Sequence, residues 1–264
     1  MIRLVLFAPT RKSLYARIVA QRILVETEVA LSAIVVRSIW SLHRFRAELR
    51  RDGPRLLEKI QTKLVLGESS LSESEEKNTT TVERIASDDL YEMARRHEIP
   101  FISAPDLNDI RVENKLANIA PHLIVFTGGG LIQSNILSIP SLGIMNCHSG
   151  ILPRYRGMDV VEWPLLEADL EKAQVGLTLH YMDRGVDTGP LLLQHHETLR
   201  AGDTIEAIRA RLEPRMIELV LKGIRGLKSD TLKPTPQMVD EGKQYYVMHP
   251  RLKEIVARNM RGSI

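Results

Sequence analysis

The chain has 264 residues, a formal net charge of +3, 44% apolar residues and 26% charged residues, which are ordinary values for a globular protein. Its single cysteine, Cys147, excludes an internal disulfide framework and a cysteine-rich zinc site. No apolar run is long enough to span a membrane, and residues 1–36 carry basic residues inside their apolar stretches, unlike a secretory signal peptide. We therefore expect a cytoplasmic protein, and the small net charge does not by itself predict nucleic-acid binding.

Strand and helix patterns alternate along the first half of the chain. Short apolar runs predict buried strands at residues 3–7, 30–36, 101–102 and 123–126. Apolar residues at helical spacing predict helices at residues 13–25, 87–97 and 108–119, the second of them capped by Ser87. This order predicts an α/β fold with a doubly wound, mostly parallel, Rossmann-like sheet, whose sites lie at the carboxyl ends of the strands.

An insertion of about residues 38–83 separates the second predicted strand from the next helix. Residues 38–66 carry apolar residues at helical intervals among many arginines, and they predict two helices broken at Gly53-Pro54. Residues 67–81 are polar, acidic and poor in aromatic residues, so we expect a mobile loop there.

The pattern changes after residue 175. Residues 175–183 alternate, with Leu177 and Leu179 on one face and Thr178 and His180 on the other, and with the apolar run at 191–194 they predict a β-hairpin. A long helix should follow at residues 204–227, capped by Asp203 and kinked or split by Pro214.

The predicted domains are a main domain of residues 1–227 and a short C-terminal extension of residues 228–264, which should form a strand or extended segment and a helix. We predict no metal site, because His195, His196 and Glu197 lie on a strand-like segment where adjacent side chains diverge.

Two polar residues follow the apolar run that ends at Met145. Side chains two positions apart in a strand point to the same side, so Asn146 and His148 should emerge together while Cys147 faces away. An amide and an imidazole side by side suit acyl transfer, in which negative charge develops on a tetrahedral oxygen. Asp187, on the hairpin loop, is the candidate carboxylate that would hold the imidazole and favour its protonated form.

These residues belong to motifs that resemble those of the 10-formyltetrahydrofolate-dependent formyltransferases. That family includes the glycinamide ribonucleotide, methionyl-tRNA and sugar N-formyltransferases. The resemblance covers most of residues 121–227, and it is weaker over residues 1–40. The motifs that carry it are Asn146-Cys147-His148, Ile151-Leu152-Pro153-Arg154-Tyr155-Arg156-Gly157, Val175-Gly176-Leu177-Thr178-Leu179-His180 and Asp183-Arg184-Gly185-Val186-Asp187-Thr188-Gly189.

The resemblance implies a formyltransferase fold and three catalytic residues. Asn146 and protonated His148 would stabilise the oxyanion that forms when an acceptor amine attacks the formyl carbon of the folate. Asp187 would orient His148, favour its charge and help to move protons.

The resemblance also implies a site for the formyl donor, 10-formyltetrahydrofolate. The backbone after the triple glycine, at residues 128–130, would recognise the pterin ring, and the hairpin loop would close the other side. The residues expected there are Leu131, Ile132, Gln133, Asp183, Gly185 and Val186.

Departures from the family pattern bear on the acceptor. Ser149-Gly150 follow His148, where family members often have Pro-Ser. The first loop reads Thr10-Arg11-Lys12-Ser13 in place of the Gly-Ser-Asn phosphate cradle of glycinamide ribonucleotide formyltransferases, although Arg11 and Lys12 could meet a phosphate as point charges. Residues 228–264 are too few for the C-terminal barrel of methionyl-tRNA formyltransferases, so we do not expect a tRNA acceptor.

Basic and aromatic residues near the predicted catalytic strand suit an anionic acceptor such as a nucleotide-linked amino sugar. The candidates for acceptor binding are Arg11, Lys12, Arg154, Tyr155, Arg156 and His180. Structural roles are equally open for two of them, because Arg156 could hydrogen-bond loop carbonyls and His180 could be a packed strand histidine. Tyr245 and Tyr246 should pack on the core, with stacking on the acceptor as the alternative.

We therefore predict an N-formyltransferase that moves a formyl group from 10-formyltetrahydrofolate to a primary amine of a small molecule, with an amino sugar nucleotide as the leading candidate. The alternatives are glycinamide ribonucleotide or methionyl-tRNA formyltransferase-like activity, a formyltetrahydrofolate hydrolase, and a non-catalytic folate- or nucleotide-binding protein. An apolar face of the hairpin or of the C-terminal extension would also allow a homodimer.

Overall fold

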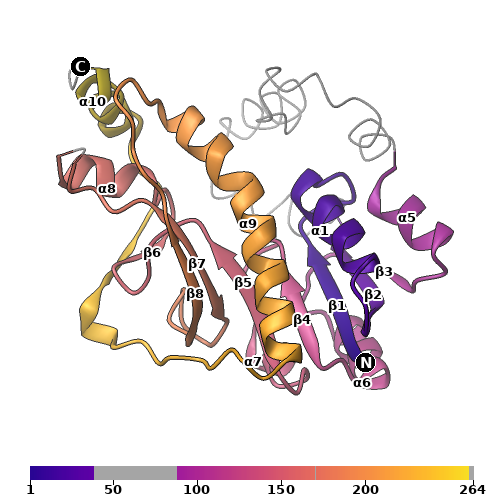
Figure 1. The fold of residues 1–264 in the computed structure, drawn as a ribbon. Coiled ribbons are helices and arrows are strands. Elements are labelled where there is room, and N and C mark those ends of the chain that lie inside the picture. The colour runs from indigo at the N-terminus through magenta and orange to yellow at the C-terminus, as the bar shows by residue number, and fades with distance from the viewer. Residues whose placement is uncertain (39–87, 170, 262–264) are drawn as a thin grey trace.

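The computed structural model describes residues 1–38, 88–169 and 171–261 (Figure 1). The two helices and the mobile loop predicted within residues 38–83, and Ser87 as a helix cap, lie outside the described residues except for Ser38. None of the helices described is both long enough and apolar enough to cross a lipid bilayer.

A seven-stranded sheet in the order β3-β2-β1-β4-β5-β7-β8 forms the centre of the protein. The strands from β3 to β5 run parallel, and β7 and β8 continue the sheet in antiparallel fashion. The strand order reverses between β1 and β4, so the fold is the doubly wound, mostly parallel α/β fold that the sequence predicts. The strands are β1 (Ile2–Ala8), β2 (Val29–Arg37), β3 (Phe101–Ala104), β4 (Leu123–Phe126), β5 (Gly143–His148), β7 (Gly176–Tyr181) and β8 (Leu191–His196).

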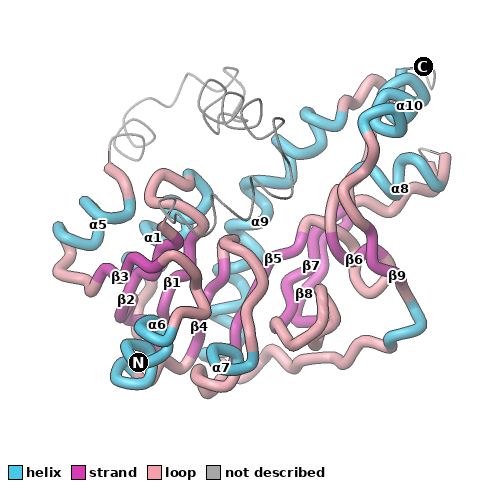
Figure 2. The backbone as a smooth tube through the Cα atoms, turned by 180° about the vertical axis from the view of Figure 1, so that it is seen from behind, coloured by secondary structure: helices cyan, strands magenta, loops and turns pink. Residues whose placement is uncertain are grey.

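Helices cover both faces of this sheet. Alternate residues of β1 enter separate cores: Leu4 and Leu6 pack with α1, α5 and α9, whereas Val5 and Phe7 pack with α6 and α7. Figure 2, seen from behind, shows α6 and α7 on the face away from α1 and α9 of Figure 1. The helices are α1 (Leu14–Leu24), α5 (Leu90–Arg96), α6 (Ile110–Ile119), α7 (Ser134–Leu137), α8 (Glu162–Glu167), α9 (Ile205–Lys228) and α10 (Pro250–Arg261).

Side-chain caps determine where several helices begin, and the predicted cap Asp203 was wrong. The cap of α5 is Asp89, whose carboxylate accepts from the N–H groups of the first turn. The cap of α9 is Thr204, because the carboxylate of Asp203 is already bound by Arg211. Pro214 does not split α9, which continues as one helix and is anchored to the core on both sides of the proline.

The C-terminal extension forms the predicted strand and helix and packs on the rest of the protein. Its strand β9 (Lys243–Tyr245) pairs in parallel with the short strand β6 (Tyr155–Gly157), which follows β5 in the sequence. The helix α10 contributes Val256 and Met260 to the main core. In Figure 1 the extension runs below β8, returns to β6, and ends at α10 beside α8. The division of the chain at residue 227 stays a prediction.

Helix α9 packs against β5, the strand that carries Asn146 and His148, on the face that buries Met145. A Cβ atom at Gly223 would lie 2.3 Å from Cδ2 of Leu179 and 2.9 Å from Sδ of Met145. These distances are too short for non-bonded carbon and sulfur, so the close approach of α9 to β5 and β7 depends on glycine at this position.

We expect Gly223→Ala to destabilise the protein. Alanine gains about 1 kcal/mol over glycine in a helix, but an extra methyl group in a packed core typically costs about 1–3 kcal/mol. The net loss of up to about 2 kcal/mol should be measurable as a lower urea midpoint. The exposed neighbour Lys222, changed to alanine, is the matched control and should alter stability by less than about 0.5 kcal/mol.

Candidate active site

Strand β5 presents Asn146 and His148 together at its carboxyl end, as predicted, and Cys147 on the opposite face within the main core. The neighbouring strand β7 runs antiparallel, and its register places His180 opposite Asn146 and Thr178 opposite His148. Polar side chains from two adjacent strands therefore meet at this point of the sheet.

Asp187 joins these residues from the loop between β7 and β8. Its Oδ2 accepts a hydrogen bond from the N–H of Gly157 at 2.9 Å and lies 3.5 Å from Nδ1 of His148. Its Oδ1 lies 3.5 Å from Nε2 of His180. The structure thus brings the three predicted catalytic residues together and adds His180 as a fourth member of the cluster.

The backbone partners of the two imidazoles define which ring nitrogens carry hydrogen. Nε2 of His148 lies 2.8 Å from the carbonyl oxygen of Tyr155, so it must donate, and in the neutral ring Nδ1 is the atom able to accept a proton. Nδ1 of His180 lies 2.7 Å from the carbonyl oxygen of Tyr181 and must donate as well. Nε2 of a neutral His180 can then accept from the Asn146 amide nitrogen at 3.2 Å, which orients that amide.

Burial and charge act in opposite directions on this cluster. Burial lowers the pKa of His148 below its usual value, and the charge of Asp187 and the Tyr155 carbonyl offset this only in part. Burial would raise the pKa of Asp187, but the neighbouring imidazoles of His180 and His148, which favour the ionised carboxylate, and the N–H of Gly157 lower it overall. The free protein therefore holds a neutral His148 beside an ionised Asp187 at neutral pH, and a protonated His148 has to arise during a reaction.

The segment predicted to recognise the pterin follows β4. All three glycines have positive φ, between 112° and 128°, and a Cβ at Gly129 would lie 2.7 Å from Cδ1 of Leu107. Asn108, on the loop between β3 and α6, then holds the segment with both ends of its amide: Nδ2 donates to the Leu131 carbonyl at 2.8 Å, and Oδ1 accepts from the Gln133 N–H at 2.7 Å.

The predicted other wall of that site is the hairpin loop. The Oδ1 atom of Asp183 accepts from the N–H of Gly185 at 3.0 Å and from the hydroxyl of Thr188 at 2.6 Å, so this carboxylate shapes the turn. Val186 is half-buried beside Asp187. Contacts of these residues with a folate stay predictions.

Comparison with known proteins places the chain in a family. Residues 67–222 match the family described as formyl transferase, with residues 67–87 outside the described part of the structure. The chain belongs to the formyl transferase family. The formyltransferase resemblance seen in the sequence is thereby confirmed.

Individual relatives match only part of their own length. Methionyl-tRNA formyltransferases from Pelobacter propionicus and Pseudomonas fluorescens are 31% and 35% identical over 147 and 143 residues, which is 55% and 54% of this chain and 45% and 44% of theirs. The chain spans about half the length of the curated relatives it matches.

Solved structures of the family share the fold. A phosphoribosylglycinamide formyltransferase from Anaplasma phagocytophilum has a TM-score of 0.59 at 15% identity, covering 94% of this chain and 100% of its own. The N-formyltransferase from Helicobacter canadensis, in complex with folinic acid and dTDP-3-aminofucose, has a TM-score of 0.58 at 16% identity, covering 94% and 71%. These likenesses confirm the predicted formyltransferase fold.

The residues predicted to bind the acceptor separate into exposed and buried groups in this family member. Arg11, Lys12 and Arg154 are exposed, and Arg11 is paired with Asp89. Tyr155 and Arg156 are only 1% and 4% exposed. Their side chains therefore offer no open surface to an acceptor, and for Arg156 the alternative of binding loop carbonyls is supported by its hydrogen bond to the Met238 carbonyl.

His180 was placed among the acceptor-binding candidates, and the structure gives it another position. Its side chain is 1% exposed and contacts Asn146 and Asp187, so it is a buried member of their cluster and is not open to an acceptor. The two tyrosines of the extension differ. Tyr245 packs against Tyr155 in the core, as predicted, whereas Tyr246 is 70% exposed and does not pack there.

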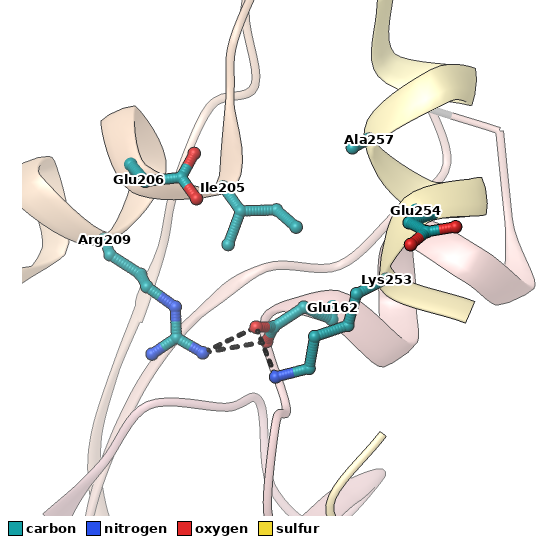
Figure 3. A pocket seen from close by; sticks show the side chains of 7 residues that line it. All are labelled: Glu162, Ile205, Glu206, Arg209, Lys253, Glu254 and Ala257. Carbon is teal, nitrogen blue, oxygen red and sulfur yellow. Dashed lines mark hydrogen bonds and ion pairs between the residues drawn. The ribbon is translucent and has the colours of Figure 1, made fainter. Parts of the chain in front are cut away.

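A surface hollow of about 470 Å³ lies apart from the catalytic cluster, between α8, α9 and α10 (Figure 3). The buried carboxylate of Glu162 is at its centre and accepts from Nη2 of Arg209 at 2.9 and 2.8 Å, with Nζ of Lys253 at 3.7 Å. These charged groups bind one another, so we assign the hollow a structural role. Its lining residues are Glu162, Ile205, Glu206, Arg209, Lys253, Glu254 and Ala257.

Asn108 is a site residue that the sequence did not single out. The turn Asp106-Leu107-Asn108 follows β3 after Pro105, and a polar amide just beyond the carboxyl end of a parallel strand is the signal that could have identified it. In the described part of the chain, no group of three or more His, Cys, Asp or Glu side chains is placed to hold a metal ion.

The lowered pKa of His148 predicts how stability depends on pH. An unfolded histidine binds a proton near pH 6.5, whereas the folded His148 binds one only at lower pH, so the unfolded state takes up more protons as the pH falls. The free energy of unfolding should therefore decrease below about pH 6.5 more steeply in wild type than in His148→Gln, which retains an N–H donor for the Tyr155 carbonyl. Urea unfolding at several pH values measures both slopes; equal slopes would contradict the buried, neutral histidine.

Proposed function

We propose that the chain is an N-formyltransferase that transfers a formyl group from 10-formyltetrahydrofolate to a primary amine. The cluster of Asn146, His148 and Asp187 carries this proposal, because it presents an amide donor, a neutral imidazole and an ionised carboxylate at one strand end. Membership of the formyl transferase family supports it. Folate as donor is also supported by related structures whose descriptions name folinic acid or 5-N-formyl-THF. The predicted compartment remains the cytoplasm.

The chemistry follows from the states of the three side chains. The acceptor amine attacks the formyl carbon, a C–N bond forms, and negative charge develops on the formyl oxygen. One hydrogen of the Asn146 amide is directed at His180, and the second is available to that oxygen.

His148 acts as the proton carrier. Its Nδ1 takes a proton from the attacking nitrogen, and Asp187 at 3.5 Å stabilises the imidazolium that results. When the intermediate collapses, the bond from carbon to N10 of the folate breaks and His148 returns the proton to N10. Tetrahydrofolate and the formylated amine leave, and the site regains its neutral imidazole.

The donor would bind between two backbone segments. In our proposal the backbone of Leu131, Ile132 and Gln133, held by Asn108, recognises the pterin, and the Asp183 to Asp187 loop covers its other side. Two of the segment's polar groups, the Leu131 carbonyl and the Gln133 N–H, are engaged by Asn108, so this amide fixes the segment while other backbone groups remain for the ligand.

For the acceptor, an amino sugar nucleotide is our first candidate. Arg11, Lys12 and Arg154 are exposed cations suited to phosphate, and the fold is shared with the Helicobacter canadensis enzyme described with dTDP-3-aminofucose. Methionyl-tRNA is the second candidate, because the curated relatives at 31–35% identity carry that activity in their names. These relatives weigh against the expectation that the acceptor is not a tRNA.

The test is release of tetrahydrofolate from 10-formyltetrahydrofolate by the purified protein, alone and with amino sugar nucleotides, glycinamide ribonucleotide, methionyl-tRNA and other primary amines. Amine-dependent release is expected, and His148→Gln and Asp187→Asn should lower kcat by about 100-fold or more, as for loss of general acid-base catalysis. Equal release with and without every amine would instead indicate a hydrolase. Folate binding without release for any acceptor would indicate a binding protein.

We expect Asn108→Ala to weaken donor binding more than turnover. Loss of both hydrogen bonds frees the segment at residues 131–133, which should raise KM for 10-formyltetrahydrofolate roughly tenfold, while kcat changes by less than about threefold. Asn114→Ala, on the exposed face of α6, is the matched control and should behave like wild type. An unchanged KM in Asn108→Ala would place the donor elsewhere.

A further inference from the structure

The backbone of Asp187 has an unusual conformation that the surrounding structure must maintain. Its φ is 54°, in the left-handed region that residues other than glycine seldom adopt. This conformation sets the direction of its carboxylate, which must reach both His148 and His180. A group that fixes the Asp187 backbone therefore controls the geometry of the catalytic cluster.

The side chain of Gln237, in the C-terminal extension, bonds to this backbone. Its Nε2 donates to the carbonyl oxygen of Asp187 at 3.0 Å and to that of Gly189 at 2.5 Å. Both neighbours are carbonyls, so only the NH₂ end of the amide can face them. Its Oε1 is buried and accepts from no group in the described residues, so the side-chain hydrogen bonds described for Gln237 all go to the Asp187 loop.

Backbone contacts on both sides of Gln237 fix its position along the loop. Thr235 exchanges two hydrogen bonds with Leu191, at 2.7 and 2.8 Å, just beyond the loop. The carbonyl of Met238 accepts from Nη2 of the buried Arg156 at 3.1 Å. The amide of Gln237 is therefore held between two anchors rather than placed by a free side chain.

The same extension supports the other end of Asp187. Gly157 donates its N–H to the carboxylate and belongs to β6, which pairs with β9 of the extension. A Cβ at Gly157 would lie 2.2 Å from the carbonyl oxygen of Tyr245, which shows how closely the two strands pack. Both the main chain and the carboxylate of Asp187 thus depend on residues after α9, outside the family match at residues 67–222.

We propose that Gln237 is a positioning residue that holds Asp187 in its left-handed conformation and so directs the carboxylate at His148. Its described side-chain hydrogen bonds go to the carbonyls of Asp187 and Gly189, so in this proposal it acts on the reaction through Asp187. The expected change in kcat rests on the proposed formyl transfer. The expected change in the pKa of His148 does not depend on turnover.

The kinetic test is a double-mutant cycle. Gln237→Leu removes both donated hydrogen bonds and should lower kcat roughly ten- to a hundredfold, with KM for 10-formyltetrahydrofolate changed by less than about twofold. In the Asp187→Asn background the same change should cost less than about twofold, because the carboxylate that it positions is already gone. Gln174→Leu, at an exposed position away from the cluster, is the matched control for the chemical change. Additive losses would overturn the proposal.

A titration of His148 tests the proposal without activity. Its imidazole signal is followed by proton NMR against pH and assigned by its loss in His148→Gln. Asp187→Asn should lower the pKa of His148 by removing the carboxylate, and Gln237→Leu should shift it in the same direction while Gln174→Leu leaves it unchanged.

A wild-type pKa for His148 in Gln237→Leu would overturn the proposal, whatever the protein's activity. A protein without formyl transfer that still showed the shift would overturn the proposed function and support the role of Gln237. If Gln237→Leu does not fold, Gln237→Met, which has a side chain of similar length and no donor hydrogen, is titrated in its place.

Discussion

An ionised carboxylate inside a protein is stable only when hydrogen-bond donors and positive charge replace the water it has lost. Groups from three separate segments surround Asp187: the N–H of Gly157 on β6 donates to it, and the imidazoles of His148 on β5 and His180 on β7 each place a nitrogen 3.5 Å away that carries positive charge when the ring is protonated. None of these segments can supply the others' contribution. The cluster therefore forms only when the parallel part of the sheet, the hairpin and the short β6–β9 pair have all assembled. Its geometry depends on the folding of the core.

The two faces of β5 have different roles: one contributes to the polar cluster and the other packs in the core. One face carries Asn146 and His148, and the other buries Met145 and Cys147 against α1 and α9. Burial raises the pKa of the Cys147 thiol above its usual value, which keeps it protonated and poorly reactive beside the catalytic face. Packing behind the strand fixes its backbone, and the fixed backbone in turn determines where the polar side chains point.

What the sequence predicts correctly depends on local periodicity. The shared face of Asn146 and His148, the positions of the strands and the hairpin all follow from patterns over a few residues. The partners of those residues do not: Asn146 meets His180 34 positions away, and Gln237 meets Gly189 48 positions away. Burial of Tyr155 and Arg156 likewise depends on pairing with β9, and no local pattern around residues 146–157 predicts that pairing. The cap of α9 was misassigned because Asp203 and Thr204 are adjacent polar residues: Asp203 is bound by Arg211, and Thr204 accepts from the N–H of Ala207 in the first turn.

The order in which these elements leave the ribosome adds a consequence. The strand that carries Asn146 and His148 and the loop that carries Asp187 are synthesised before α9, whereas Gln237 and β9 follow it. A nascent chain can therefore possess all three proposed catalytic side chains and all seven strands of the described central sheet before Gln237, which bonds to the Asp187 loop, has been synthesised. Competence for catalysis would be acquired late in translation, when the segment after α9 has emerged and docked, and not at the moment when the last catalytic residue is added.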